Sequence, residues 1–301
     1  MTVPLDLQQR VANPPKAGVV LELLKPVTWF PPMWAFACGA VSSGVVISEH
    51  KAEFALGIFL TGPLVCAASQ AVNDWFDRDV DALNEPGRPI PSGRIPGNWG
   101  LRIAIGWTLL SLAVGSLFGT RGILAAVVAN VLSWAYSAPP IRLKNNGWLG
   151  NAAVGLSYEG LAWIAGAALL MSTGWPDWRI VTLALLYSAG THGIMTLNDF
   201  KSIDGDARSG VRSLPVALGA NRAAWLACIV MMIPQVIVAS LLLYWQRPWY
   251  AAGILVLMVA QLPLMRRLLQ SPRERAIWYS GTGVTLFVLG MMVSAFSLRT
   301  A

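Results

Sequence analysis

Long apolar stretches alternate along the chain with short segments rich in glycine, proline, asparagine or charged residues. Each apolar stretch is about 20 residues long, which is the length that an α-helix needs to cross a lipid bilayer. The intervening segments hold the residue types that end helices and form loops. The pattern predicts an all-α membrane protein with about nine transmembrane helices, near residues 27–48, 54–73, 99–118, 121–138, 149–171, 179–198, 221–245, 249–265 and 276–298.

The composition agrees with a chain that lies mostly in a membrane. Hydrophobic residues make up 55% of the 301 residues and charged residues only 12%, which is about half of the roughly 25% found in soluble globular proteins. A large soluble domain is therefore excluded. We expect residues 1–25 to form a short cytosolic N-terminal segment without a cleavable signal peptide, because they contain no continuous apolar run. Residues 26–301 are expected to form a single transmembrane domain.

Basic residues are unevenly distributed among the predicted loops. With the N-terminus in the cytosol, 17 of the 22 Lys and Arg residues fall on the cytosolic side and 5 on the opposite side. Membrane proteins place such an excess in cytoplasmic loops, so a cytosolic N-terminus is predicted. The net charge of +7 is spread over short clusters and forms no long basic arm. This argues against a nucleic-acid partner and favours membrane phosphates or an anionic substrate.

The acidic residues are concentrated in two short motifs. The first motif, residues 73–81, reads Asn-Asp-Trp-Phe-Asp-Arg-Asp-Val-Asp, and the second motif, residues 198–206, reads Asn-Asp-Phe-Lys-Ser-Ile-Asp-Gly-Asp. Together they hold seven of the 15 Asp and Glu residues. Each motif lies at the predicted cytosolic end of a span and is followed by a basic, proline-containing stretch, at 88–94 and 212–215. The spacing indicates an internal repeat of about 125 residues.

The spacing within the motifs favours a metal site. If a helix continues through the first motif, Asn73, Asp77 and Asp81 share one face, and Asp199 and Asp206 have a comparable spacing in the second. Carboxylates this close repel one another unless cations neutralise them, and hard oxygen ligands suit Mg²⁺ bound to a phosphate. Solvated loop charges are the alternative, but they do not explain two matched motifs. The motifs predict a Mg²⁺-diphosphate site with these candidate ligands: Asn73, Asp74, Asp77, Asp81, Asp199, Asp204 and Asp206.

Both motifs resemble those of the UbiA superfamily of intramembrane prenyltransferases, and the resemblance runs from about residue 25 to the C-terminus. Within the superfamily, the two motifs and their flanking sequences are similar to the chlorophyll and bacteriochlorophyll synthases. The segment 136–144, Tyr-Ser-Ala-Pro-Pro-Ile-Arg-Leu-Lys, is also similar to theirs. The stretch 155–163, Gly-Leu-Ser-Tyr-Glu-Gly-Leu-Ala-Trp, resembles the bacteriochlorophyll branch more closely. Ser202 departs from the many members that have an acidic residue there, although the pigment synthases share the serine.

The resemblance implies a particular reaction. A geranylgeranyl or phytyl group would pass from its diphosphate to the 17-propionate carboxylate of bacteriochlorophyllide a, with Mg²⁺, or Mn²⁺ in its place, as the cofactor. This is the esterification step of bacteriochlorophyll a biosynthesis. The fold implied is a set of transmembrane helices around a central cavity in the bacterial inner membrane, cytoplasmic or intracytoplasmic. Membrane lipids, a geranylgeranyl reductase and pigment–protein assembly factors are the further partners implied.

The chemistry of the residues agrees with such a transfer. Breaking an allylic C–O bond builds negative charge on the diphosphate, which a metal ion and basic side chains stabilise. The acceptor is a carboxylate that is already ionised at neutral pH, so no general base is required. The predicted catalytic residues are Asp77, Asp81, Asp199, Asp206, Arg88 and Lys201. The predicted diphosphate-binding residues are Arg88, Arg94, Tyr136, Arg142, Lys144, Lys201 and Arg212, with Arg88 and Lys201 ranked first.

Three residues inside predicted spans are candidates for binding the pigment acceptor. Glu159 is an acid within the fifth span, where a functional role is the default interpretation, and a protonated Glu bonded to a neighbouring helix is the alternative. Glu159 or the adjacent Tyr158 is hypothesised to contact the chlorin ring. His192 lies seven residues before Asp199 and is a candidate ligand for the pigment's central Mg²⁺. A hydrogen-bonded core histidine is the alternative interpretation.

Two other functions remain open on the sequence. One is a chlorophyll synthase or another aromatic-acceptor prenyltransferase with the same diphosphate site. The other, from a different class, is a cation-coupled transporter, because intramembrane acids and repeats also mark transporters. Transporter acids are expected near the bilayer midplane, whereas both motifs lie at span ends beside basic loops.

Overall fold

The computed structural model describes residues 14–299 and is built almost entirely from helices. The chain folds into two compact units. Unit 1 comprises the described residues 14–30 and 59–142, and unit 2 comprises 31–58 and 143–299. Among the described residues, the extended structure is limited to an isolated bridge between Asn146 and Arg212 in unit 2. The first motif belongs to unit 1 and the second motif to unit 2.

Unit 1 is a small helical cluster that presents the first motif on its central helix. Its helices are α2 (Ala17–Leu24), the 3₁₀ turn η1 (Pro26–Thr28), the π-helix η3 (Leu60–Cys66), α5 (Ala67–Asn84), α6 (Trp99–Ser116) and α7 (Gly119–Ser137). Helix α5 packs against α2, α6 and α7. The cluster buries Leu23 of α2, Val72 of α5 and Ile95 of the segment between α5 and α6, all at most 1% exposed. Burial of this apolar face fixes the orientation of α5 and hence of the motif near its C-terminal end.

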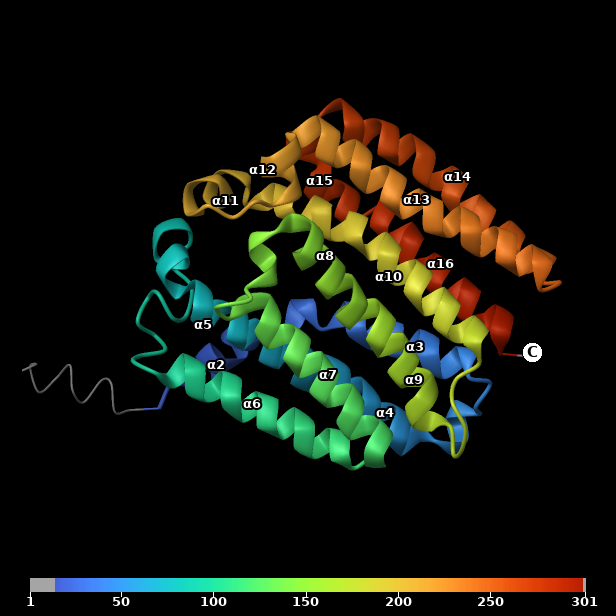
Figure 1. The fold of residues 1–301 in the computed structure, drawn as a ribbon, viewed down its shortest axis with the longest axis horizontal. Coiled ribbons are helices and arrows are strands. Elements are labelled where there is room, and N and C mark those ends of the chain that lie inside the picture. Colours follow the sequence, from blue (N-terminus) through green and yellow to red (C-terminus); the bar gives the residue numbers. More distant parts are fainter. Residues whose placement is uncertain (1–13, 300–301) are drawn as a thin grey trace, which may run out of the picture. The chain divides into compact units, whose positions relative to one another are not determined.

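Unit 2 contains most of the long helices. Its first elements are α3 (Phe30–Ser42), η2 (Ile47–Glu49), α4 (Lys51–Phe59), η4 (Leu143–Asn145), α8 (Gly147–Gly155), the π-helix η5 (Leu156–Leu161) and α9 (Ala162–Leu170). Then follow α10 (Trp178–Asn198), η6 (Asp199–Lys201), α11 (Ile203–Ser209), α12 (Leu214–Leu218), α13 (Ala220–Tyr244), α14 (Pro248–Gln270), α15 (Pro272–Ser280) and α16 (Gly283–Leu298). Helix α10 packs against α8, α13 and α16 (Figure 1).

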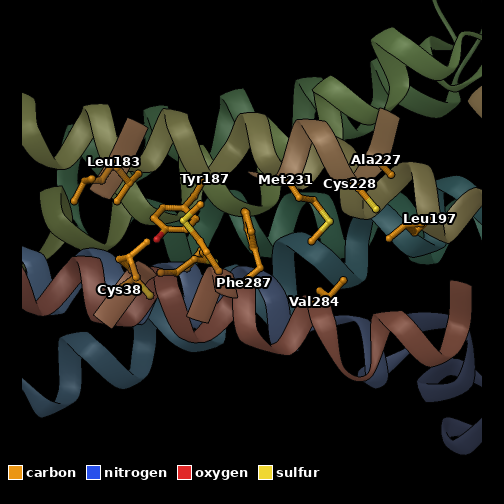
Figure 2. Packing of buried hydrophobic residues seen from close by; sticks show 14 of the residues in the cluster. Cys38, Leu183, Tyr187, Leu197, Ala227, Cys228, Met231, Val284 and Phe287 are labelled. Atoms are coloured by element: carbon orange, nitrogen blue, oxygen red, sulfur yellow. The ribbon is translucent and has the colours of Figure 1, made fainter. Parts of the chain in front are cut away.

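The core of unit 2 lies around the side chains of α10. Figure 2 shows Tyr187 next to Phe287 and Cys38, with Met231 and Cys228 from α13 farther along the same cluster. The rings of Tyr187 and Phe287 meet edge to face at a centroid distance of 5.2 Å, which is a favoured aromatic geometry. Apolar side chains therefore dominate the core around α10, and the buried polar residues Ser188, Thr191 and Thr196 lie among them.

Two helices of unit 2 approach each other closely because glycine lies at their contact. A Cβ atom on Gly39 of α3 would lie 1.9 Å from the carbonyl oxygen of Trp163 on α9. A Cβ atom on Gly166 of α9 would lie 2.0 Å from the carbonyl oxygen of Phe36 on α3. Small residues of this kind let membrane helices pack with their backbones in contact.

The predicted spans correspond to helices in the structure. Within residues 14–299, seven helical segments are long and apolar enough to cross a membrane: 51–84, 99–116, 147–170, 178–201, 220–244, 248–270 and 272–298. The predicted spans 27–48 and 121–138 fall on α3 and α7, which are helical but outside this set. Helix α3 has only 13 residues, and α7 includes the polar residues Arg121 and Asn130. The prediction of an all-α, multi-pass membrane protein is confirmed.

Candidate functional site

The first motif lies on the last turns of α5, which continues without a break to Asn84. The predicted helical face is therefore formed. Asp74 and Asp81 are buried, Asp77 is half-buried and Asp79 is exposed. Asn73 lies one turn before Asp77, and its amide donates to Ser137 Oγ of α7 at 3.5 Å.

Each of the three inward-facing carboxylates of the first motif is paired with a cation of unit 1. Lys25 Nζ lies 2.6 Å from Asp74 Oδ1, and Arg142 Nη2 lies 2.9 Å from Asp77 Oδ1. Arg88 Nη1 lies 2.7 Å from Asp81 Oδ2 and 3.6 Å from Asp74 Oδ1. Carboxylates removed from water need such partners, because an unpaired buried charge is costly.

Arg88 connects the two buried carboxylates of the motif to the following loop. Its Nε donates to Glu85 Oε2 at 2.6 Å, and its Nη1 donates to Asp81 Oδ2 at 2.7 Å. Burial disfavours the charged guanidinium, but the hydrogen bond to Glu85 and the charges of Asp74 and Asp81 outweigh burial. The pKa of Arg88 is therefore raised above its usual value. Arg88, which the sequence predicts as a catalytic and diphosphate-binding residue, therefore contacts two carboxylates of the first motif.

The donor set of the first motif fits a hard divalent cation. Oδ2 of Asp74 is buried and, within residues 14–299, makes no hydrogen bond. This oxygen, the carboxylates of Asp77 and Asp81 and the amide oxygen of Asn73 are the ligand types that Mg²⁺ prefers. In the described part of the chain, no three His, Cys, Asp or Glu side chains are grouped as a metal site. The carboxylates instead contact Lys25, Arg88 and Arg142.

Two other residues predicted to bind diphosphate lie in unit 1. Arg94 donates to both carboxylate oxygens of Glu22, at 2.5 and 2.7 Å, and to the carbonyl of Gly87. These bonds tie Arg94 to α2 and to its own loop rather than to the first motif. The hydrogen bond from Arg94 holds the pKa of Glu22 below its usual value. Tyr136 is half-buried in the last turn of α7, next to Ser137.

The second motif is not one continuous helix. Helix α10 ends at Asn198, a 3₁₀ turn follows over 199–201, and α11 begins at Ile203. The uninterrupted helical spacing considered from the sequence therefore does not hold here. Ser202 nevertheless remains beside Asp206, because its hydroxyl donates to Asp206 Oδ2 at 3.0 Å. The same hydroxyl oxygen also lies 3.3 Å from the carbonyl oxygen of Asp199.

Asp199 is the carboxylate of the second motif that forms a hydrogen bond with helix α8 of unit 2. Its Oδ2 accepts a hydrogen bond from Asn151 Nδ2 of α8 at 3.3 Å. Asn151 is buried and also donates to Thr196 Oγ1. Lys201 is exposed and donates to Asn198 Oδ1 at 2.8 Å. Asp204 is exposed and lies 3.8 Å from Arg273 Nη1.

Lys144 and Arg212 come from two segments of unit 2 that are joined through their backbones. Arg212 N donates to the carbonyl of Asn145 at 3.0 Å, and Gly147 N donates to the carbonyl of Arg212 at 2.9 Å. A Cβ atom on Gly147 would lie 2.6 Å from Leu214 N, so glycine permits this approach. The loop before α8 and the basic stretch after the second motif are therefore neighbours.

The three candidate acceptor residues lie on α10 and on the π-helix η5. Glu159 is only 5% exposed, and among the described residues its Oε2 has no hydrogen-bond partner. Tyr158 is half-buried beside it. Nε2 of His192 forms a hydrogen bond with the carbonyl oxygen of Trp148 at 3.2 Å, so this ring nitrogen has a protein partner. The centroids of the His192 and Trp148 rings lie 5.4 Å apart.

The sequence interpretation missed three residues that contact the motifs. Lys25 binds Asp74, Glu85 binds Arg88, and Asn151 binds Asp199. Asn151 is a polar residue within the mostly apolar predicted span 149–171, and that placement was an available signal. Lys25 stands 48 or more residues from the first motif, so only the packing of α2 on α5 brings it near.

These features define an integral, multi-pass helical membrane protein whose carboxylates are gathered in two motifs beside basic side chains. The chain belongs to the UbiA prenyltransferase family, whose model matches residues 24–295. The resemblance seen in the sequence is thereby confirmed, and the protein is a prenyltransferase.

Three curated relatives are similar to the chain over most of its length. It is 56% identical to the bacteriochlorophyll synthase 33 kDa chain of Cereibacter sphaeroides, over 99% of this chain and 98% of that protein. It is 52% identical to the protein of the same name from Rhodobacter capsulatus, over 98% of this chain and 97% of that protein. It is 41% identical to the chloroplastic chlorophyll synthase of Arabidopsis thaliana, over 94% of this chain and 75% of that protein.

Solved structures of distant proteins share the fold. A digeranylgeranylglyceryl phosphate synthase structure matches with a TM-score of 0.71 and 22% identity, over 93% of this chain and 99% of that chain. A UbiA homolog from Archaeoglobus fulgidus bound to DMAPP and Mg²⁺ matches with a TM-score of 0.68 and 20% identity, over 94% and 99%. At these identities the likeness establishes the fold alone.

Proposed function

We propose that this protein esterifies bacteriochlorophyllide a with a geranylgeranyl or phytyl group taken from its diphosphate. The observation that carries the proposal is the 56% identity, over nearly the whole of both chains, to a bacteriochlorophyll synthase chain. The described geometry supports it, because buried carboxylates paired with basic side chains suit the binding of a metal and a diphosphate.

The reaction replaces one C–O bond with another. The bond between the allylic carbon and the diphosphate oxygen breaks, and the electron pair leaves with the diphosphate. A propionate oxygen of the pigment then bonds to the same carbon. The propionate is ionised at neutral pH, so no proton is transferred and no general base is needed.

Mg²⁺, when bound, neutralises the charge that builds on the departing diphosphate. The metal in the Archaeoglobus fulgidus homolog supports this assignment, and Mn²⁺ is the alternative ion. The residues proposed to hold it are Asn73, Asp74, Asp77, Asp81, Asp199, Asp204 and Asp206. The buried Oδ2 of Asp74, which makes no hydrogen bond within residues 14–299, supports Asp74 as one of these ligands.

Basic side chains are proposed to bind the diphosphate oxygens. Arg88 and Arg142 already contact motif carboxylates, and the guanidinium fork suits phosphate oxygens equally well. Lys25 joins this group because it contacts Asp74 at the same motif. The remaining members of the proposed set are Arg94, Tyr136, Lys144, Lys201 and Arg212.

The pigment is proposed to contact Glu159, Tyr158 and His192. Support comes from Glu159, which is buried on a π-helix with one carboxyl oxygen unbonded among the described residues. Single π-helical turns inside α-helices occur frequently at functional sites. The apolar helices around these residues would also keep water from the allylic carbon.

The proposed location is the bacterial inner membrane, with the N-terminus and both motifs on the cytosolic side. The distribution of 17 Lys and Arg residues against 5 supports this orientation.

Chlorophyllide a is the second candidate acceptor, because the chain is also 41% identical to a chlorophyll synthase. The cation-coupled transporter considered from the sequence is not supported, since the chain belongs to a prenyltransferase family.

The acceptor is tested with purified protein, Mg²⁺ and geranylgeranyl diphosphate. Parallel reactions receive bacteriochlorophyllide a, chlorophyllide a or 4-hydroxybenzoate, and chromatography separates the products. The proposal expects the geranylgeranyl ester of bacteriochlorophyllide a as the main product. A clear preference for chlorophyllide a would support the second candidate, and prenylation of 4-hydroxybenzoate alone would contradict both.

A further inference from the structure

An apolar groove lies between two neighbouring helices of unit 2, away from both motifs in the sequence. Helices α13 and α14 run side by side (Figure 1), and the groove between them has a volume of about 500 Å³. Apolar side chains from both helices line it, including Ile229, Met232 and Leu262. This volume lies within the range of about 300–1,000 Å³ that ligand pockets have.

The helices that form the groove expose large apolar side chains along much of their length. Ile229 and Ile233 of α13 and Val259 and Leu262 of α14 are each about half or more exposed. Both helices are long and apolar enough to cross a membrane. A membrane span exposes such side chains to lipid tails, so the open side of the groove faces the part of the bilayer that holds acyl chains.

One end of the groove is polar. Arg266 and Gln270 line it there, and Arg266 lies four residues before the end of α14, about 6 Å along the helix axis. Within residues 14–299, the side chain of Arg266 forms no ion pair or hydrogen bond. Gln270 Oε1 accepts a hydrogen bond from Arg275 Nη1 at 2.9 Å, which leaves the amide NH₂ of Gln270 as a donor. Trp225, 57% exposed, flanks the same end.

We propose that this groove binds an anionic glycerophospholipid, with an acyl chain along its apolar walls and the phosphate at Arg266 and Gln270. Charge complementarity selects this occupant, because the polar end offers a guanidinium and an amide donor, and the described lining includes no carboxylate. An apolar helix of another protein would cover the guanidinium of Arg266 without pairing it, which is unfavourable. The proposal depends on the membrane-spanning fold and not on the proposed enzymatic function.

Arg267 provides a matched control for Arg266. It is the next residue of α14, carries the same charge, is exposed and does not line the groove. The full-length protein in detergent is incubated with phosphatidylglycerol or phosphatidylcholine of identical acyl chains, and bound lipid is measured by native mass spectrometry. We expect wild type to retain phosphatidylglycerol preferentially. Arg266→Gln should lower its retention about tenfold, because a charged hydrogen bond is lost, whereas Arg267→Gln should resemble wild type.

A second variant tests the apolar part of the groove while keeping its charge. Ile229→Trp places a larger side chain on the wall, so retention of phosphatidylglycerol should fall although Arg266 is present. Equal retention by Arg266→Gln and Arg267→Gln would contradict the proposal. Equal retention of both lipids by wild type would contradict it too, as would a dimer that covers the groove and excludes lipid.

Discussion

At the scale of single residues, Arg88 is the cation on which the first motif depends most. It contacts Asp81, Asp74 and Glu85, whereas Lys25 and Arg142 each pair with one motif carboxylate. Asp81 is 7% exposed, so its charge is compensated mainly by Arg88. The residue types in the motif predicted this basic partner, but Lys25 depends on tertiary packing that the sequence does not reveal.

Replacing Arg88 with alanine should destabilise the protein even before activity is considered. The carboxylate of Asp81 would remain buried without its cation, which we expect to lower the free energy of unfolding by about 1–3 kcal/mol. The measurement is the thermal unfolding midpoint in detergent without Mg²⁺. Arg94→Ala is the control, because Arg94 pairs with the exposed Glu22 and such pairs contribute little. Equal losses in both variants would show that Arg88 has no special role.

Replacing Glu159 with glutamine should weaken binding of the pigment and leave binding of geranylgeranyl diphosphate unchanged. Glutamine keeps the shape but cannot provide a carboxyl group, so we expect the KM for bacteriochlorophyllide a to rise about tenfold. The KM for geranylgeranyl diphosphate should stay the same. Glu53→Gln, at an exposed position of α4, is the control. An unchanged pigment KM in Glu159→Gln would remove Glu159 from the acceptor site.

At the scale of elements, the two motifs differ although their sequences match. Helix α5 continues through the first motif, whereas α10 ends at Asn198, the first residue of the second motif. Residue spacing alone predicts the same helical face in both cases. The difference lies in the second motif, where the Ser202 hydroxyl donates to Asp206 Oδ2 and lies 3.3 Å from the carbonyl oxygen of Asp199, contacts that support a turn. Serine competes with the helix backbone in this manner.

Helices α13 and α14 are joined by a buried polar pair that should fix their register. Gln235 and Gln261 are fully buried and donate to each other at 3.2 and 2.9 Å. Gln235→Leu should leave Gln261 without this partner and lower stability by about 1 kcal/mol. The double variant Gln235→Leu/Gln261→Leu should recover part of that loss, because no polar group of the pair is left unsatisfied. Thermal unfolding of the single and double variants measures the coupling, and additive losses would contradict it.

At the scale of the whole molecule, the apolar periodicity predicted the fold class and the positions of the helices. It did not predict the division into two units, because α3 and α4 lie early in the chain but belong mainly to unit 2. It also overestimated the length of α3, which has only 13 residues. The motifs predicted the family, which a match over residues 24–295 confirms. The pairing of Arg94 with Glu22 was not predictable, since it depends on how α2 packs.

The central claim is that the carboxylates of both motifs carry Mg²⁺-dependent prenyl transfer. The most direct measurement is ester formation from geranylgeranyl diphosphate and bacteriochlorophyllide a by Asp77→Ala, Asp199→Ala and the control Asp79→Ala. The side chain of Asp79 is 86% exposed within the first motif. We expect each of the first two variants to lose activity at least about a hundredfold, Asp79→Ala to remain close to wild type, and chelation of Mg²⁺ to abolish wild-type turnover. Near-normal turnover by Asp77→Ala or Asp199→Ala, with the protein still folded in the membrane, would contradict the claim.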